Sequence, residues 1–315
     1  MTVLDIFDTS GTQNTNATHG AITMHGFGHN RSDFARYSPL DIASNNVCDV
    51  WLTGTPTALQ DRFDDPRYYK GGMLASADSI KTGMVAYWGL EEDGTSNRVD
   101  SHDGLDMTIV ATAPGRDTGA DGVNYAVEFT RGSNDTLIHS LSANDLSPGN
   151  SDFTFACWVK FKTGSLTSFQ SIAGIWLPAG DQREWLLQMN TVGQKLEFNV
   201  TSDGTFAGLG RAQHPTSPLV ETWYFVVGAY DSVNDLVKIS VTKAGDPIGG
   251  YTTAAHSGGV FEGTGDFTMG SNGNIDVTFA VDGYVDEAAY WSRLITDDEK
   301  EFLYNSGTAL TYGDL

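Results

Sequence analysis

Positive charge is what this 315-residue sequence has least of. Lysine and arginine together number 18, against 40 aspartate and glutamate residues, so the formal net charge is −22. A surface that acidic repels phosphate groups, which disfavours binding to nucleic acid and docking on anionic lipid. No apolar run approaches the roughly 20 residues that a membrane-spanning helix needs. Both observations predict a soluble protein without nucleic-acid or membrane partners.

Cysteines and targeting signals are also scarce. The chain has only Cys48 and Cys157, which lie far apart in the sequence. Cys157 stands in an alternating apolar run, which favours a buried free thiol over a disulfide. The opening residues MTVLDIFDTSGTQN have neither the positive start nor the apolar stretch of a secretory signal peptide. We therefore expect synthesis in a cytosol.

The charge distribution divides the chain in two. Residues 1–82 carry nine acidic and six basic residues, a net −3, whereas residues 83–315 carry 31 and 12, a net −19. The first segment shows little sustained hydrophobic periodicity, and residues 71–83 (GGMLASADSIKTG) are small, polar and glycine-bearing. We predict an irregular N-terminal anchoring and assembly region over residues 1–82 and a separate domain over residues 83–315.

The N-terminal region contains aromatic residues of the kind that dominate interface energetics. These candidate interface residues are Trp51, Phe63, Tyr68 and Tyr69. A small private core would explain the same residues equally well. If they form an interface, the assembly contacts should lie mostly in this nearly neutral region.

Strand patterns dominate the second region. In FTFACWVKF (153–161), large apolar residues and cysteine alternate with Thr154, Ala156, Trp158 and Lys160, which is the period of a half-buried strand. Similar aromatic and β-branched runs occupy residues 84–90, 125–130, 184–189, 195–200, 222–230, 236–243 and 277–291. Turn residues separate them, so the sequence predicts an all-β sandwich.

One short helix is expected near the C-terminus. In ITDDEKEFLYNSG, Thr296 and Glu299 have the spacing of a capping box, and Gly307 suits the position just after a helix. Phe302 and Leu303 would dock this helix on the sandwich. We expect a structural role for it.

Four ordered motifs resemble the laminin-G-like, concanavalin A-like jelly roll. They are MVAYWGLEEDGTSNRVDSHDGLDMTI, FTFACWVKF, TWYFVVGAYD and GYVDEAAYWSRLITDDEKEFLYNSG, which together extend over residues 84–307. The resemblance implies a jelly-roll sandwich with one short C-terminal helix. It also implies carbohydrate binding, since glycans are the ligands most associated with this fold, and often a calcium ion at a sheet edge.

The sequence offers little for catalysis. Glucanases of this fold use carboxylates spaced along one strand, and that spacing is absent. Asp286 and Glu287 are adjacent, so a regular strand would point them to opposite faces. There is no Gly-x-Ser-x-Gly motif and no phosphate-binding Gly-x-x-x-x-Gly-Lys motif. We therefore predict a protein that is not an enzyme.

Two binding sites are predicted instead. DSHDGLD places Asp100, Asp103 and Asp106 in one turn-rich loop, where oxygen ligands could gather around Ca²⁺, although a solvated acidic turn explains the same residues. A glycan site needs an aromatic face flanked by polar groups. Candidates for it are Trp176, Trp185, Asp181 and Arg183, with core packing as the alternative for both tryptophans.

Two functions of different classes fit these features. The first is a structural protein of a bacteriophage particle, which displays the laminin-G-like domain on the capsid or tail surface. Its partners would be other virion proteins, bound through residues 1–82, further copies of the chain, and neutral glycans of a host. Particle assembly in a cytosol followed by lysis reconciles an extracellular kind of fold with the missing signal peptide. The alternative is a free bacterial carbohydrate-binding or adhesion module.

Overall fold

The computed structural model describes residues 80–140 and 145–315, and the backbone of five short strands before them. Those strands are Leu4–Ile6 (β1), Thr18–His19 (β2), Ile22–Thr23 (β3), Ala35–Tyr37 (β4) and Val50–Leu52 (β5). The chain divides into two compact units, Met1–Leu74 and Ala75–Leu315. In the first, β5 pairs with β1 and β4, and β2 pairs with β3. The side chains of Trp51, Phe63, Tyr68 and Tyr69 lie outside the described residues, as does Cys48.

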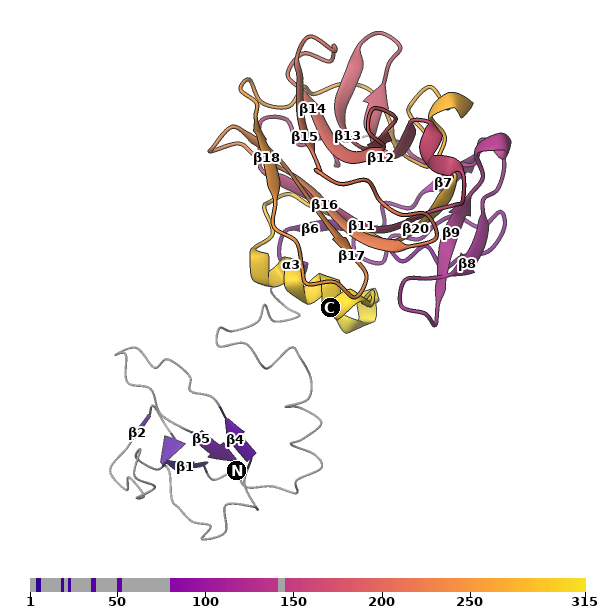
Figure 1. The fold of residues 1–315 in the computed structure, drawn as a ribbon. Coiled ribbons are helices and arrows are strands. Elements are labelled where there is room, and N and C mark those ends of the chain that lie inside the picture. Colours follow the sequence, from indigo (N-terminus) through magenta and orange to yellow (C-terminus); the bar gives the residue numbers. More distant parts are fainter. Residues whose placement is uncertain are drawn as a thin grey trace. The chain divides into compact units, whose positions relative to one another are not determined.

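The second unit consists of two antiparallel sheets packed face to face (Figure 1). The seven-stranded sheet has the order β15 (Leu209–Gln213), β14 (Lys195–Thr201), β13 (Gln182–Asn190), β12 (Gln170–Leu177), β19 (Phe267–Met269), β10 (Thr136–His139) and β7 (Thr108–Val110). The eight-stranded sheet has the order β18 (Thr252–Ala255), β17 (Leu236–Lys243), β16 (Trp223–Asp231), β11 (Phe153–Phe161), β20 (Gly283–Trp291), β9 (Tyr125–Phe129) and β8 (Gly115–Thr118), and β6 (Met84–Trp88) also pairs with β20. This architecture confirms the predicted all-β sandwich.

The main core lies between the two sheets. On β11, the five apolar residues of the predicted alternation are fully buried in it: Phe153, Phe155, Cys157, Val159 and Phe161. Cys157 is a free thiol, as the sequence predicts, and burial raises the pKa of this thiol. Because the thiolate is the reactive form, Cys157 acts as a small apolar side chain.

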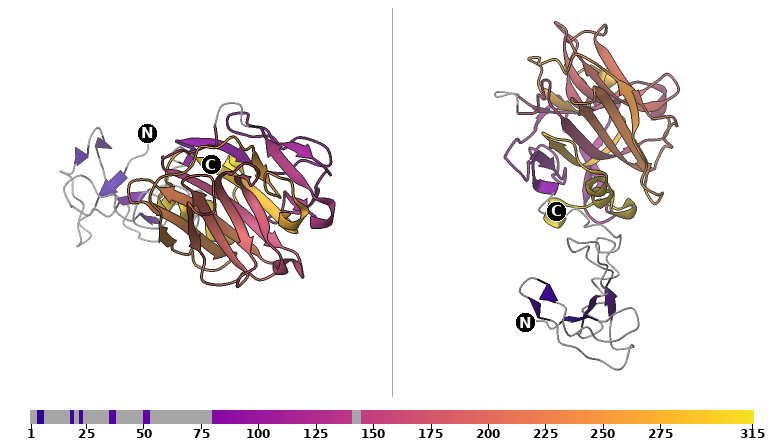
Figure 2. Two further views of the ribbon diagram at one scale, coloured as in Figure 1. Left: turned by 90° about the horizontal axis from the view of Figure 1, so that it is seen from above. Right: turned by 90° about the vertical axis from the view of Figure 1, so that its left-hand side faces the viewer.

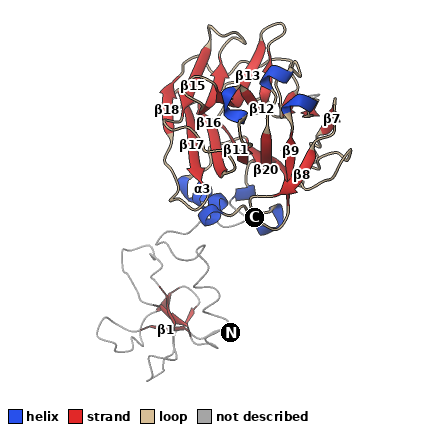
Figure 3. Ribbon diagram, turned by 45° about the vertical axis from the view of Figure 1, so that its right-hand side comes forward, coloured by secondary structure: helices blue, strands red, loops and turns tan. Residues whose placement is uncertain are grey.

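A second, smaller core covers part of the outer face of the eight-stranded sheet. Ala156 and Trp158, the alternate residues of β11, pack there against Phe302 and Leu303 of helix α3 (Asp297–Tyr304). Figures 1 and 3 show α3 beside β16 and β17, and Figure 2 shows the C-terminus on the same side of this unit. The helix therefore has the docking role that its sequence predicts.

The start of α3 matches its prediction and its end does not. The Thr296 hydroxyl accepts from the backbone N–H of Glu299, whose carboxylate accepts from the N–H of Thr296, which is the expected capping box. The helix ends at Tyr304 rather than next to Gly307, because its C-cap, Asn305, already takes the left-handed conformation, with a φ of 44°. None of the helices in the described part of the chain has the length and apolar character that crossing a membrane requires.

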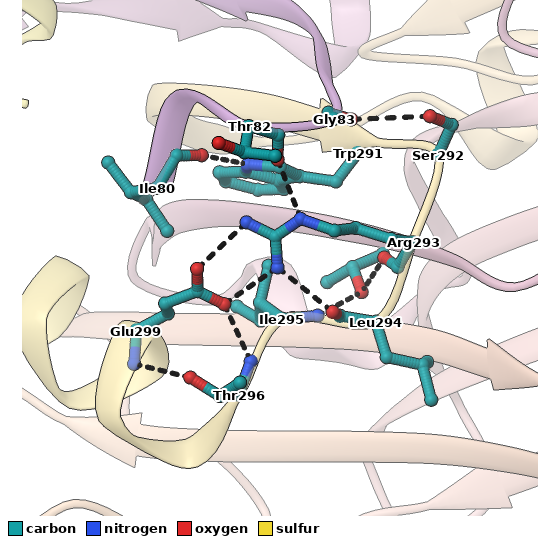
Figure 4. A network of polar contacts seen from close by, with 11 residues as sticks. Ile80, Thr82, Gly83, Trp291, Ser292, Arg293, Leu294, Ile295, Thr296 and Glu299 are labelled. Carbon is teal, nitrogen blue, oxygen red and sulfur yellow. Dashed lines mark hydrogen bonds and ion pairs between the residues drawn. The ribbon is translucent and has the colours of Figure 1, made fainter. Parts of the chain in front are cut away.

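Residues 80–83, where the chain enters the sandwich, are fastened by Arg293 (Figure 4). Its Nε donates to the carbonyl of Thr82 at 2.6 Å. Its two terminal nitrogens donate to the carboxylate of Glu299 at 2.7 and 2.8 Å, and Glu299 is 3% exposed. One guanidinium thus joins the entry segment to the cap of the C-terminal helix.

The predicted strand over residues 277–291 is shorter than expected. Its first part forms a 3₁₀ turn at Val277–Phe279, and β20 begins only at Gly283. Asp276 accepts from the N–H of Thr278 and so starts this turn.

Candidate functional site

Trp185, one of the residues predicted to contact a glycan, lies in the core instead. It is 0% exposed, its ring centroid lies 5.4 Å from that of Phe155, and its indole N–H donates to the carbonyl of Leu146 at 3.2 Å. The pairing of β12 with β13 is irregular at this point, and Trp185 stands opposite Ile175, which also faces the other sheet. The prediction that Trp185 contacts a glycan is therefore wrong, because its side chain packs in the core between the two sheets.

The other three predicted glycan residues lie together, around an aromatic residue that the sequence analysis did not single out. We call Trp176, Asp181, Arg183 and Phe206 the Phe206 rim. The guanidinium of Arg183 donates to Asp181 at 2.6 Å, and its carbon lies 4.4 Å from the centroid of the Phe206 ring. Trp176 is buried, at 6% exposed, as the core-packing alternative predicts, and its ring meets that of Phe206 edge-on with the centroids 6.2 Å apart. Phe206 is 65% exposed, so the ring face turned away from Arg183 is open to solvent.

Hydrogen bonds of Arg183 hold the residues of the Phe206 rim in place. Arg183 also donates to the carbonyl of Gly204 at 3.0 Å, which joins the start of β13 to the loop after β14. Gly204 has a φ of +78°, and a Cβ there would lie 1.9 Å from the carbonyl oxygen of Asp181. Only glycine permits this approach. The exposed ring is therefore held by a buried arginine rather than carried on a free loop.

This arrangement has the parts that a sugar site needs. An open aromatic face can stack on the C–H face of a pyranose, while flanking polar groups bind its hydroxyls. The Asp181 side chain is 60% exposed and can accept hydrogen bonds from such hydroxyls.

The loop predicted to bind calcium is organised by one of its aspartates. The carboxylate of Asp100 accepts four backbone N–H groups at 2.8–3.1 Å, those of Tyr87, His102, Asp103 and Leu105. Asp106 accepts from the N–H of Asp100 at 2.9 Å, and the Asp103 side chain is 67% exposed. Asp100 has little acceptor capacity left for a cation. Calcium at this loop stays a prediction, and the geometry favours another place for it.

That other place is a group of three carboxylates, which we call the Glu91 cluster: Glu91, Asp286 and Glu287. One carboxylate oxygen from each lies within 4.8 Å of the others, and no other such group of three occurs in residues 80–140 and 145–315. The expectation that Asp286 and Glu287 point to opposite faces is wrong. The register of β20 against β11 shifts here, and Glu287 has a φ of 45°. Such a bulge breaks the period of two and re-aims a side chain.

Burial and mutual repulsion govern the electrostatics of the Glu91 cluster. Burial raises the pKa of Glu287 to about 9, with a further rise from the neighbouring Asp286. Burial also raises the pKa of Asp286 well above its usual range, and Asp286 is 1% exposed. The hydroxyl of Tyr87 donates a hydrogen bond to the carboxylate of Glu287.

The Glu91 cluster fits a hard divalent cation. Asp286 accepts from the N–H of Ala120 through one oxygen, at 2.7 Å, while its other oxygen is buried without a hydrogen-bond partner. Ca²⁺ takes oxygen ligands of this kind. Its charge would favour the ionised form of these buried acids and displace their protons. Sequence spacing does not reveal this cluster, because Glu91 lies almost 200 positions before Asp286 and Glu287.

A further buried acid, Glu184, predicts a pH dependence of stability. It is 0% exposed, its carboxylate accepts from Ser147 at 2.5 Å and from the N–H of Gly263 at 2.9 Å, and burial raises its pKa from 4.5 to about 7. Because the folded pKa is the higher one, this acid stabilises the fold fully below pH 4.5, and the contribution is lost as the pH rises through 7. The difference corresponds to about 3 kcal/mol.

Urea unfolding of the wild type and Glu184→Gln at pH 5 and pH 8 measures this contribution. We expect the free energy of unfolding of the wild type to fall more between the two pH values than that of the variant, by about 2.5 kcal/mol. Equal pH dependence in the two proteins would show that Glu184 does not carry the effect. Glu221→Gln is the matched control, because it makes the same substitution at an exposed carboxylate that is bound to Thr163.

A family model matches more than half of the chain. The model of the concanavalin A-like lectin/glucanases superfamily matches residues 131–299. No curated protein matches the chain.

Solved structures with the same fold share little sequence with it. Botulinum neurotoxin type C, whose cell entry is described as dependent on interaction with two ganglioside molecules, is 11% identical, with a TM-score of 0.51 over 73% of this chain and 53% of that chain. The binding domain of botulinum neurotoxin serotype C1 is 12% identical, with a TM-score of 0.51 over 72% and 53%. A Trypanosoma rangeli sialidase in complex with sialic acid is 13% identical, with a TM-score of 0.50 over 87% and 42%. The chain thus spans about half the length of these proteins, and the likeness establishes the jelly-roll fold.

Proposed function

Because the chain belongs to the concanavalin A-like lectin/glucanases superfamily, we propose that its jelly-roll unit is a non-enzymatic carbohydrate-binding domain that holds its ligand at the Phe206 rim. The observation that carries this proposal is the exposed ring of Phe206, backed by the buried guanidinium of Arg183. A rigid aromatic face loses little conformational entropy when a sugar stacks on it. The strongly negative charge of the chain disfavours acidic sugars, so we propose neutral glycans as the ligands.

Phe206→Ala tests this site. We expect roughly a ten-fold loss of affinity for a bound neutral oligosaccharide, because the stacking face disappears while the buried base remains. Titration calorimetry of the full chain with the same oligosaccharide measures the loss.

A matched control exists on the other sheet. Tyr125 is 44% exposed and also lies against an arginine, since the Arg116 guanidinium carbon is 4.1 Å from its ring centroid. Tyr125→Ala should keep the affinity of the wild type. Equal losses in both variants, or none in Phe206→Ala, would contradict the proposed site.

We also propose that the domain binds one calcium ion at the Glu91 cluster. Glu91, Asp286 and Glu287 would hold the ion, and its charge would stabilise the ionised form of these buried acids. The proposed effect is stabilisation of the strands that carry these residues.

The setting in which the domain acts is a separate proposal: a virion structural protein that is anchored through residues 1–82. The sequence features that support it are the near-neutral, aromatic-bearing N-terminal segment and the strongly acidic domain that follows. Electron microscopy of purified particles tests it. Density for this chain at a fixed, symmetric position on a capsid or tail is the expected result, and a protein that is absent from particles and acts as a free glycan-binding monomer would support the adhesion module instead.

A further inference from the structure

The outer face of β13, β14 and β15 carries a polar network centred on Glu197. This residue alternates with Leu196 and Phe198, which face the core, so its carboxylate points away from the opposite sheet. Glu197 is nevertheless only 1% exposed, because side chains of the neighbouring strands surround it. In the register of the sheet, Gln188 and Gln213 stand directly opposite Glu197 on either side.

Five nitrogen atoms converge on this carboxylate. The four amide groups donate from Gln188 at 2.6 Å, Asn190 at 2.9 Å, Gln213 at 3.1 Å and Asn199 at 3.3 Å. The guanidinium of Arg211, which is 43% exposed, lies 3.5 Å away. The carboxylate is thereby surrounded by hydrogen-bond donors of the protein.

Glu197 fixes which way the amides turn. An ionised carboxylate only accepts hydrogen bonds, so each amide must direct its NH₂ group toward it and its carbonyl away from it. The carbonyl of Asn190 then accepts from the N–H of Val192 at 2.6 Å. The carbonyl oxygen of Asn199, however, is buried and has no hydrogen-bond partner, and neither has the hydroxyl of Ser171, which stands opposite Gln188 in the register.

Unpartnered buried acceptors of this kind call for a donor that the chain itself does not supply. Gln188 and Gln213 are the partly exposed amides of the network, and each has, besides the N–H donated to Glu197, a second N–H and a carbonyl oxygen, which form a donor and an acceptor side by side. Neighbouring hydroxyl groups of a polyol offer the complementary pair. Glu197 and Arg211 carry opposite charges, so the network has no net charge with which to attract an ion.

We infer that the network of Glu197 is a second contact surface for a neutral, polyhydroxylated ligand, with Glu197 as the positioning residue that orients the amides. This inference deepens the proposed function and rests on it for the ligand class. Trp176 and Arg183 of the Phe206 rim lie on β12 and β13 of the same sheet. At about 3.3 Å per residue, Arg183 and Gln188 are about 16 Å apart along β13, so one extended ligand could reach both places.

Side-chain amide resonances of the ¹⁵N-labelled full chain test the inference. The probes are D-glucose, D-galactose and D-mannose, added up to the molar range. We expect at least one of them to shift the side-chain amide signals of Gln188, Asn199 and Gln213. We also expect Glu197→Gln to reduce this affinity roughly ten-fold, because the amides lose their fixed orientation.

Two further variants serve as a substitute and as a control. Gln213→Leu removes one amide at the edge of the network and serves if Glu197→Gln does not fold, while Glu221→Gln is the control that should bind as the wild type does. Shifts confined to the backbone around Phe206 would overturn the inference and leave the proposed function standing. Shifts in the network alone would support the inference and contradict the Phe206 rim. No shift anywhere, or wild-type affinity in folded Glu197→Gln, would overturn the inference.

Discussion

Replacing Arg293 with methionine is expected to lower the free energy of unfolding by about 3–5 kcal/mol. The loss is large because Glu299, 3% exposed, would keep its buried charge without the paired hydrogen bonds from Arg293. The entry segment would lose its bond at Thr82. It would keep the bond from the Trp291 indole to the carbonyl of Ile80, at 2.7 Å, and the bond from Ser292 to the carbonyl of Gly83 (Figure 4). Urea unfolding measures the change.

The matched control is Arg116→Met. Arg116 pairs with Asp93 at 3.3 Å, but the two side chains are 34% and 69% exposed, so this loss should stay below about 1 kcal/mol. Limited proteolysis adds a local readout, since Arg293→Met should expose residues 80–83 to cleavage before the sandwich unfolds. If the two variants are equally stable, the contacts of Arg293 with Thr82 and Glu299 contribute no more than a surface ion pair does.

Asp286→Asn is expected to abolish a stabilisation of the wild type by calcium. A ligand at 100 times its dissociation constant stabilises the native state by about 2.7 kcal/mol, which for a domain of this size raises the melting temperature by about 5–10 °C. The variant removes a carboxylate that would ligate the ion once its proton is displaced, so its melting temperature should be the same with calcium and with excess chelator. Differential scanning calorimetry of both proteins in the two conditions gives the comparison.

Asp103→Asn distinguishes calcium binding at the DSHDGLD loop from calcium binding at the Glu91 cluster. This aspartate belongs to the DSHDGLD loop and not to the Glu91 cluster. With the ion at the cluster, Asp103→Asn should keep the full calcium response. A response that is lost in Asp103→Asn and kept in Asp286→Asn would instead place calcium in the loop, and a wild type without any response would exclude both sites.

Regular patterns in the sequence predicted the fold well. The alternation of FTFACWVKF gave β11 its bounds and its inward face, and Thr296 with Glu299 gave the start of α3. Short or polar edge strands were missed, among them β8, where all four residues are exposed. The buried strand β12 was missed too, because Gly174 and two register shifts break the period of two that marks a strand.

The candidate sites depend on features that spacing does not reveal. A bulge in β20 brings Asp286 and Glu287 to one side, whereas adjacency in a regular strand predicts the opposite. Phe206 stands in a glycine-rich loop, and its packing on Arg183 follows from a close approach of two loops. The network of Glu197 joins residues from three strands, and only the register of the sheet brings them together.

The most direct measurement is the binding of the full wild-type chain to an array of neutral and sialylated oligosaccharides at physiological ionic strength. We expect retention on neutral oligosaccharides and loss of that signal in Phe206→Ala, with the signal kept in Tyr125→Ala. An array on which no oligosaccharide binds, or on which only sialylated ones bind, would contradict a neutral-glycan site at the Phe206 rim.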